Sequence, residues 1–150
     1  MNKASSQSSD LERAYLAGKK LYEGDRASQA LGIRMIETTP GRASVAMRVR
    51  ADMLNGHRVC HGGLIFTLAD TAFAFACNSY GANTLAAAGS IDFLAPGREG
   101  DELTATASEL WRSGRSGLYE VEVTNQRGER IALFRGRSQQ VAGNLLDPKA

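Results

Sequence analysis

The sequence predicts a single α+β domain in which a curved antiparallel sheet wraps around one central helix. The chain has 150 residues, 43% of them hydrophobic, which suits one compact domain with its own core. A segment in its middle is apolar on nearly every face of a helix, and about six other segments alternate between apolar and polar residues as strands do. Repeated strand–helix–strand units are missing, so the predicted sheet is antiparallel.

The first predicted element follows a polar start. Residues 1–9 are rich in serine and are expected to form a flexible tail, with a second short tail at 144–150. The domain itself is expected to span residues 10–143. It opens with a helix from Asp10 to about Glu23, where apolar residues recur at helical spacing and Asp10 suits the N-cap.

Strands are predicted on both sides of the central segment. Two precede it, at 33–38 and 42–51, and the second is expected to be half-buried because its apolar residues largely occupy alternate positions. The four that follow are expected at about 85–94, 102–112, 117–125 and 130–141. Glycine-rich and polar links between them have hairpin chemistry.

The central helix is expected from Gly62 to Tyr80. Its longest apolar stretch, 64–77, is 14 residues long and contains Asp70. A membrane span needs about 20 predominantly apolar residues, so this helix belongs in a protein core. Because apolar side chains surround it, it must be covered on most sides.

Charge is unevenly distributed, since residues 51–97 hold only four of the 34 charged residues. The net charge of +2 is too small to suggest a nucleic-acid partner. The two cysteines have no CxxC spacing, and the first residues lack the apolar core of a signal peptide. These features predict a cytoplasmic protein with neither a membrane nor a nucleic-acid partner.

Asp70 is the candidate catalytic residue. A carboxylate in an apolar helix is costly unless it is paired, reaches a solvated cleft or has a raised pKa. A raised pKa suits a base or nucleophile that works near neutral pH. The structural alternative is that Asp70 caps a backbone group or pairs with a buried arginine, and the central segment offers only Arg58.

The loop Asn55 to Gly63 precedes the helix. Gly62 and Gly63 would leave backbone N–H groups bare at the positive end of the helix, which suits an oxyanion, although a plain glycine turn is the alternative. Gly62 and Asp70 are eight residues apart, about 12 Å along a helix. One helix cannot readily present both to one carbonyl, but two antiparallel copies can, which predicts a site shared within a C2 dimer.

Other kinds of site have weaker support. His57, Cys60 and His61 lack a recognisable fourth ligand, so no metal site is predicted. Cys60 beside His61 has no third group to orient a thiol nucleophile. Arg115 and Arg137 are candidates for contacting phosphates, or else belong to a solvated sheet edge.

The residues around the central helix resemble a known family. They are Met53 to His57, Cys60 to Gly63, Leu68 to Ala74, Ile91 to Gly97, Gly100 to Ala107 and Ala132 to Gly136. Together they resemble the hotdog-fold acyl-CoA thioesterases, in particular the branch that serves bacterial phenylacetate degradation. The most specific mark is an acidic residue eight positions after the first glycine of H-G-G, and the resemblance covers about residues 10–143.

The resemblance implies a role for each site residue. Asp70 would be the catalytic carboxylate, acting as general base or nucleophile, and the Gly62 N–H would polarise the thioester carbonyl. Asn55 would place the thioester or a water molecule. His61 would support the loop, with Gly63 beside the substrate.

It also implies hydrolysis of phenylacetyl-CoA or a hydroxylated aryl-acetyl-CoA, without a cofactor, by dimers that assemble into tetramers. Phe66, Phe73, Tyr80 and Phe93 are expected to shape the acyl pocket. Two alternatives stay open: a hotdog module that binds acyl-CoA without turnover, and a hotdog acyl-thioester dehydratase. A dehydratase needs a catalytic histidine, and Asp70 has no evident partner beyond the histidines of the loop.

Overall fold

The computed structural model describes residues 3–147 and 149, and its strands form one six-stranded antiparallel sheet. The elements are α1 (Lys3–Gly24), α2 (Arg26–Ala30), β1 (Arg34–Thr39), β2 (Arg42–Arg48), the 3-10 helix η1 (Ala51–Met53), α3 (Gly62–Asn78), β3 (Ala82–Phe93), β4 (Glu102–Ser113), β5 (Ser116–Thr124) and β6 (Arg130–Asn144). The strand order is β1-β2-β4-β5-β6-β3, and every neighbouring pair is antiparallel. The predicted α+β class is confirmed.

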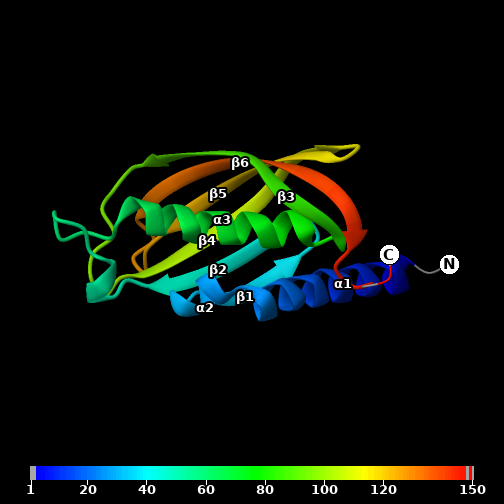
Figure 1. Ribbon diagram of the computed structural model, residues 1–150, viewed down its shortest axis with the longest axis horizontal. Helices are drawn as coiled ribbons and strands as arrows, with labels where there is room; N and C mark the ends of the chain where they lie inside the picture. The colour runs from blue at the N-terminus through cyan, green and yellow to red at the C-terminus, as the bar shows by residue number, and fades with distance from the viewer. Residues whose placement is uncertain (1–2, 148, 150) are drawn as a thin grey trace.

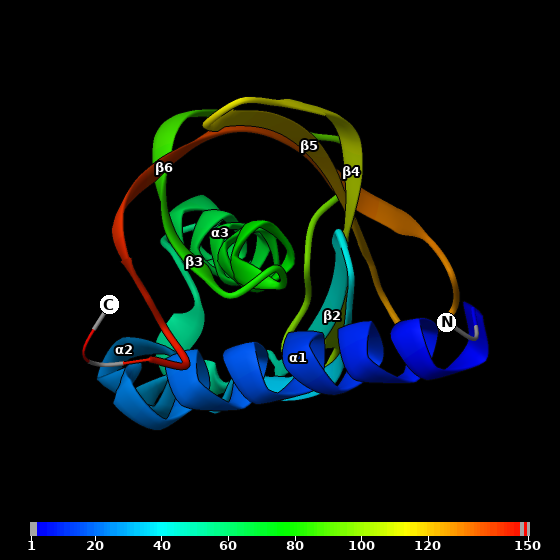
Figure 2. The same cartoon turned by 90° about the vertical axis from the view of Figure 1, so that its right-hand side faces the viewer.

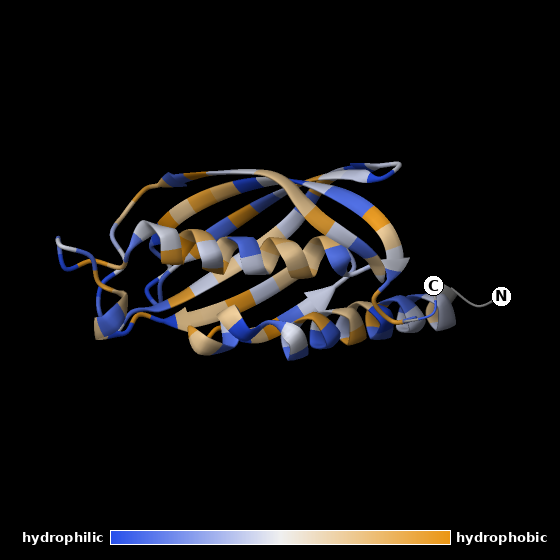
Figure 3. Cartoon of the chain, viewed as in Figure 1, coloured by the Kyte–Doolittle hydropathy of each residue, from blue (hydrophilic) through white to orange (hydrophobic). Residues whose placement is uncertain are grey.

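The sheet curves around α3, as Figures 1 and 2 show. Seen along the helix, β4, β5 and β6 arch over α3 while α1 runs across the open side below it (Figure 2). Hydrophobic colours recur along α3 and along the strands that face it (Figure 3). The curved sheet and α1 together cover much of this apolar helix. A curved antiparallel sheet around a central helix is the hotdog arrangement.

Phe73 lies at the centre of this packing. Its side chain is fully buried, and its ring meets those of Tyr119 and Phe134 at centroid distances of 5.5 and 5.7 Å. Gly136 on β6 gives these rings room, because a Cβ there would lie 2.9 Å from both phenylalanine rings. The strand can therefore approach the helix closely at a position where any side chain would collide with the core.

One side of α3 is left incompletely covered. The residues of α3 that keep accessible surface recur at helical spacing, and they include Gly62, Phe66, Asp70 and Ala74. Next to them runs β3, one of the two edge strands of the sheet, whose residues from Leu85 to Ser90 are all exposed. This strip of α3 and β3 positions the candidate site.

The N-terminal prediction needs correction. The first helix begins at Lys3, so residues 3–9 form its first turns, in which residues 4–9 are exposed, whereas a flexible tail was expected there. Asp10 lies inside the helix, where it pairs with Arg13 at 3.0 Å, and it is not the N-cap. The serine-rich composition suggested a loose segment, but it contains neither glycine nor proline to stop a helix. Residues 1–2 lie outside the described residues.

Other element boundaries in the structure also differ from the predicted ones. The second strand ends at Arg48 because the chain then enters η1, and it is buried on both faces, so the half-buried prediction was wrong. The central helix ends at Asn78 rather than Tyr80. The expected second tail begins inside β6, and the N–H of Leu145 donates to the Gly81 carbonyl at 2.8 Å. Residues 148 and 150 lie outside the described residues.

Candidate active site

The start of α3 presents one backbone N–H group to the surface. His61 is the N-cap, and its Nδ1 accepts a hydrogen bond from the Gly63 N–H at 3.2 Å. The next two N–H groups of the helix donate to the His61 carbonyl. Within the described chain the Gly62 N–H has no partner. The sequence suggested two bare N–H groups, but His61 occupies the second, so the donor available to a ligand is that of Gly62.

The loop before the helix is a small hairpin. The Asn55 N–H donates to the Val59 carbonyl at 2.9 Å, and the Asn55 Oδ1 accepts from the backbone N–H groups of His57 and Val59 at 2.9 and 3.4 Å. Arg58 has φ of 59°, and it is the only non-glycine residue in the described part with a positive φ. This strained turn leaves the Asn55 side-chain amide N–H groups without a partner among the described residues.

Gly62 and Asn55 share a pocket of about 390 Å³ with apolar walls. Its other lining residues are Val59, Cys60, Ile65, Phe93, Leu94, Ala95, Pro96 and Gly97. The Phe93 ring packs directly on Gly62, since a Cβ on Gly62 would lie 2.9 Å from it. Of the four aromatic residues expected to shape an acyl pocket, only Phe93 lines this one.

Asp70 lies two turns further along the accessible side of α3. Its carboxylate forms no hydrogen bond or ion pair within residues 3–147 and 149, so the alternative of a backbone cap or a buried arginine pair finds no support. Burial raises its pKa, and the negative charge of Asp25 raises it further. A carboxylate in this setting is a stronger base than an ordinary aspartate.

Asp70 does not line the pocket that holds Gly62 and Asn55. Gly63 and His61 open instead onto a neighbouring hollow of about 390 Å³, together with Asp52 and Leu64. Within one chain the structure therefore brings Asn55 and Gly62 together and leaves Asp70 apart, in keeping with the eight-residue spacing.

Among the described residues, the two cysteines and the histidines form no second reactive or metal-binding site. Burial raises the pKa of the Cys60 thiol to about 11 and that of the Cys77 thiol to about 12, so neither is a thiolate at neutral pH. Among the described residues, no group of three His, Cys, Asp or Glu side chains is placed to hold a metal ion. None of the described helices is long and apolar enough to cross a membrane.

The arginine candidates lie apart from each other. Arg115 lines a small cavity of about 40 Å³ near the end of α3, with Cys77 and Tyr80. Arg137 lines a groove of about 310 Å³ at β3 and β6, beside Ser90. Neither arginine forms an ion pair with another described residue, so both guanidinium groups are available to an anion.

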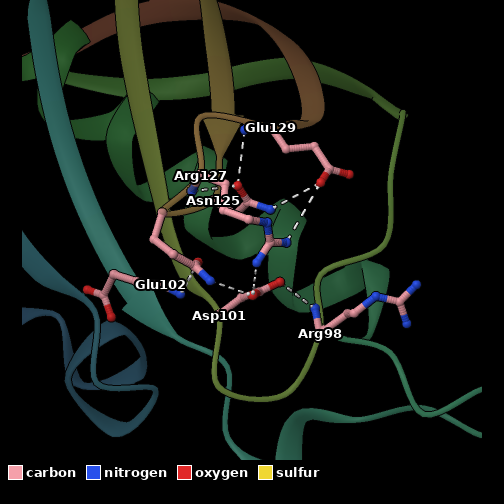
Figure 4. A network of polar contacts seen from close by, with 7 residues as sticks. Arg98, Asp101, Glu102, Asn125, Arg127 and Glu129 are labelled. Carbon is pink, nitrogen blue, oxygen red and sulfur yellow. Dashed lines mark hydrogen bonds and ion pairs between the residues drawn. The ribbon is translucent and has the colours of Figure 1, made fainter.

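Asp101 is a site-supporting residue to which the sequence analysis gave no role. It is 4% exposed, and its two carboxylate oxygens accept hydrogen bonds from the Gln126 side chain and the Arg98 N–H, both at 2.9 Å (Figure 4). Burial opposes its ionisation, but these bonds and the nearby Arg127 hold its pKa below the ordinary value.

This network fixes a wall of the pocket. Asp101 holds the turn at Arg98, and the preceding Gly97 carbonyl accepts from the Cys60 N–H at 2.7 Å. Cys60 is two residues before Gly62, so the carboxylate braces the loop that presents the free N–H. The sequence does carry a signal for this role, because an aspartate directly after Gly100 and before a strand is typical of a turn held by its side chain.

The fold and the site together define a class: a hotdog domain with a free N–H at the start of its central helix and a carboxylate eight residues later. The Thioesterase superfamily matches residues 57–132, which is half of the chain and includes the whole central helix. The chain belongs to this superfamily, and it is a thioester hydrolase.

Relatives and solved structures agree with this assignment. The chain is 48% identical over 133 residues to the acyl-coenzyme A thioesterase PaaI of Escherichia coli, covering 89% of this chain and 95% of that protein. The solved structure of E. coli PaaI, from the phenylacetic acid degradation operon, superposes with a TM-score of 0.88 over 89% of this chain and 97% of that one. A variant of the phenylacetic acid degradation protein PaaI from Thermus thermophilus is 38% identical, with a TM-score of 0.75 over 78% and 100% of the two chains.

A more distant structure holds a ligand. The protein smu.793 of Streptococcus mutans UA159, solved bound to acetyl CoA, is 26% identical to this chain. It superposes with a TM-score of 0.72 over 75% of this chain and 90% of that one.

Replacing Asp101 by Asn should destabilise the protein near neutral pH. One acceptor oxygen is lost, so a buried donor loses its charged partner, at a cost of about 2 kcal/mol in the free energy of unfolding. Because the pKa of Asp101 is lowered by folding, its contribution is present above about pH 4 and is lost as the pH falls through the folded-state pKa. Denaturant unfolding of both proteins between pH 3 and 7 should therefore show a gap that closes in acid.

The control for this measurement is Asp10→Asn, which removes an exposed carboxylate from a pair on α1. Its unfolding curve should stay close to wild type throughout the pH range. A gap between Asp101→Asn and wild type that is constant from pH 3 to 7 would contradict the role of the ionised carboxylate.

Proposed function

We propose that this thioesterase hydrolyses acyl-CoA thioesters to the free acid and coenzyme A, with Asp70 as its catalytic carboxylate. The observation that carries the proposal is an unpaired carboxylate of raised pKa on the accessible, otherwise uncharged side of an apolar helix. The free Gly62 N–H at the start of the same helix supplies the second requirement of the reaction, a donor for the developing oxyanion.

Two routes use these groups. In the first, Asp70 takes a proton from water as the water oxygen attacks the thioester carbon, and the carbonyl electrons move to the oxygen held by the Gly62 N–H. The carbon–sulfur bond then breaks, and the leaving thiolate takes up the proton from Asp70. In the second, the Asp70 carboxylate attacks the carbon directly, expels the thiolate and forms an anhydride, which water hydrolyses.

The active enzyme is proposed to be at least a C2 dimer, with a tetramer as a pair of such dimers. In two antiparallel copies of α3, Gly62 of one protomer would lie beside Asp70 of the other, which gives two equivalent sites. The exposed edge of β3 supports this arrangement, because Leu85 is 60% exposed and Phe93 is 53% exposed on a strand that lacks a neighbour on one side. Covering this edge with a second copy would remove an aggregation hazard.

The acyl group is proposed to be aromatic, as in phenylacetyl-CoA or its hydroxylated relatives. Support comes from the similarity to PaaI proteins and from the apolar pocket beside Gly62, which Phe93, Leu94 and Ile65 line. Asn55 would orient water or the thioester with its unpartnered amide, while Gly63 and His61 would border the substrate. The CoA phosphates would contact Arg115 and Arg137, whose guanidinium groups are exposed. No step of this chemistry requires a cofactor.

Asp70→Asn should lower kcat/KM for the best acyl-CoA substrate by about 10³-fold or more, because an amide can neither take up the proton nor attack the carbonyl. Thiol release is measured with phenylacetyl-CoA, a hydroxyphenylacetyl-CoA, acetyl-CoA and an enoyl-CoA, and a folded variant is verified by its circular dichroism. Wild-type rates from folded Asp70→Asn would disprove its catalytic role.

The same panel separates the alternatives. Saturable binding of every CoA ester without thiol release from the wild-type protein would indicate a binding module. Hydration of the enoyl chain with the thioester intact would indicate a dehydratase. Aryl-acetyl esters hydrolysed no faster than acetyl-CoA would contradict the proposed substrate class while leaving the thioesterase chemistry in place.

Gly62→Pro should lower kcat by about 10²–10³-fold relative to Gly62→Ala, since proline removes the N–H and alanine keeps it. Proline is tolerated at the first position of a helix, and His61 has ψ of 129°, which suits the residue before a proline. Both variants place a Cβ against the Phe93 ring, so alanine controls for that collision. Equal rates for the two variants would exclude the Gly62 N–H as the oxyanion donor.

Mixing the two inactive variants tests whether the site is shared between subunits. A heterodimer of Asp70→Asn and Gly62→Pro would carry both lesions in one site and none in the other, so co-refolding should restore up to about half of the wild-type activity per heterodimer. The measurement is thiol release from the purified hetero-oligomer, with each refolded parent as control. Activity no higher than that of the parents would contradict a shared site.

A further inference from the structure

We infer that Asp25 is a positioning residue for Asp70 and that it acts through a buried hydrogen-bonded chain formed by Ser28 and Thr71. This inference rests on the catalytic role proposed for Asp70. Asp25 lies between α1 and α2, outside the H-G-G loop and outside every residue assigned from the sequence.

The chain links the N-cap of α2 to the central helix. One oxygen of the Asp25 carboxylate accepts from the Ser28 N–H at 2.9 Å, and the other accepts from the Ser28 hydroxyl at 2.6 Å. The Ser28 and Thr71 hydroxyl oxygens lie 3.1 Å apart. Ser28 has one hydroxyl proton, which it gives to Asp25, and the Thr71 hydroxyl donates to the Thr67 carbonyl at 2.8 Å. The single Thr71 proton is therefore shared between the Thr67 carbonyl and the Ser28 oxygen in a three-centre hydrogen bond.

Both hydroxyl groups of the chain lie in the interior. Ser28 is 1% exposed and Thr71 is 7% exposed, although α3 is otherwise packed by apolar side chains. Polar groups at such positions cost free energy unless their hydrogen bonds are made. Here Asp25 accepts from Ser28, and Thr71 donates to the Thr67 carbonyl while it contacts the Ser28 hydroxyl. Thr71 directly follows Asp70, so the chain fixes the rotation of the helical turn that carries the catalytic carboxylate.

Asp25 also contributes a charge. After burial, its negative charge is the influence that raises the pKa of Asp70. The other titratable groups packed against this part of α3 are Cys77 on the helix itself and Tyr119 from β5, and burial raises the pKa of both, so both are neutral at pH 7. Tyr22 from α1 packs on Phe75, and its hydroxyl donates to the Ile33 carbonyl at 2.8 Å. Within the described chain no Lys or Arg forms an ion pair with Asp70 to offset this charge.

Capping α2 would not by itself require a charged residue. An asparagine at position 25 could cap the helix through its single side-chain oxygen, and Asn is as good an N-cap as Asp. The carboxylate adds a second acceptor and a negative charge beside the proposed base. Asp25→Asn therefore separates the cap from these two contributions.

The test is the pH profile of kcat/KM of the assembled enzyme with its best acyl-CoA substrate. The acid limb of that profile reports the pKa of the catalytic base in the free enzyme. Asp25→Asn should move the limb to lower pH by about half a unit, because a negative charge near Asp70 is lost. Ser28→Ala keeps the charge and cuts the chain, so it should lower kcat while the limb stays in place.

Glu23→Gln is the matched control, since it neutralises an exposed carboxylate two residues away on α1. It should leave the acid limb unmoved. An unmoved limb in Asp25→Asn, or an equal shift in Glu23→Gln, would overturn the inference. If one of these two results is found while Asp70→Asn is inactive, only the inference about Asp25 fails and the proposed function stands. If Asp70→Asn is active, the proposed function itself is contradicted.

Discussion

The structure depends on one constraint, the need to cover a helix that is apolar on nearly every face. A flat sheet would bury only one stripe of α3, so the sheet must curve around it, and Gly136 leaves room on β6 for the Phe73 ring of the helix. Even a curved sheet with α1 beneath it leaves a strip open beside the edge strand β3. That open strip is where the only charge of the helix, Asp70, lies.

The site uses two consequences of helix geometry. A helix start offers N–H groups without intrahelical partners, and the His61 ring takes one of them so that the Gly62 N–H remains free. A carboxylate on the same side of the helix two turns later lies too far away to meet the same carbonyl within one chain. The pocket beside Gly62 accordingly lacks Asp70, which is the reason why the proposed active site combines groups from two subunits.

Two carboxylates of this region lie in opposite electrostatic environments. Asp101 accepts hydrogen bonds from neighbouring donors and lies near Arg127, so its pKa is lowered and it braces the loop as an anion. Burial and the negative charge of Asp25 both raise the pKa of Asp70. The difference follows from the partners that the fold supplies, since both are aspartates with the same intrinsic chemistry.

The sequence alone predicted the fold class, all six strands and the central helix, which the structure confirms, because hydrophobic periodicity is a local signal. It also singled out Asp70 and Gly62 as candidate site residues, since a lone charge in an apolar segment and glycines at a helix start are local signals too. It did not predict that α1 begins at Lys3, that β2 is buried on both faces, or that His61 occupies the Gly63 N–H. It also gave no role to Asp101, whose partner Gln126 is distant in the chain, or to Asp25, whose partner Ser28 contacts the distant Thr71. Tertiary structure decided these features, since a buried polar group is defined by the neighbours that complete its hydrogen bonds, and those neighbours come together only on folding.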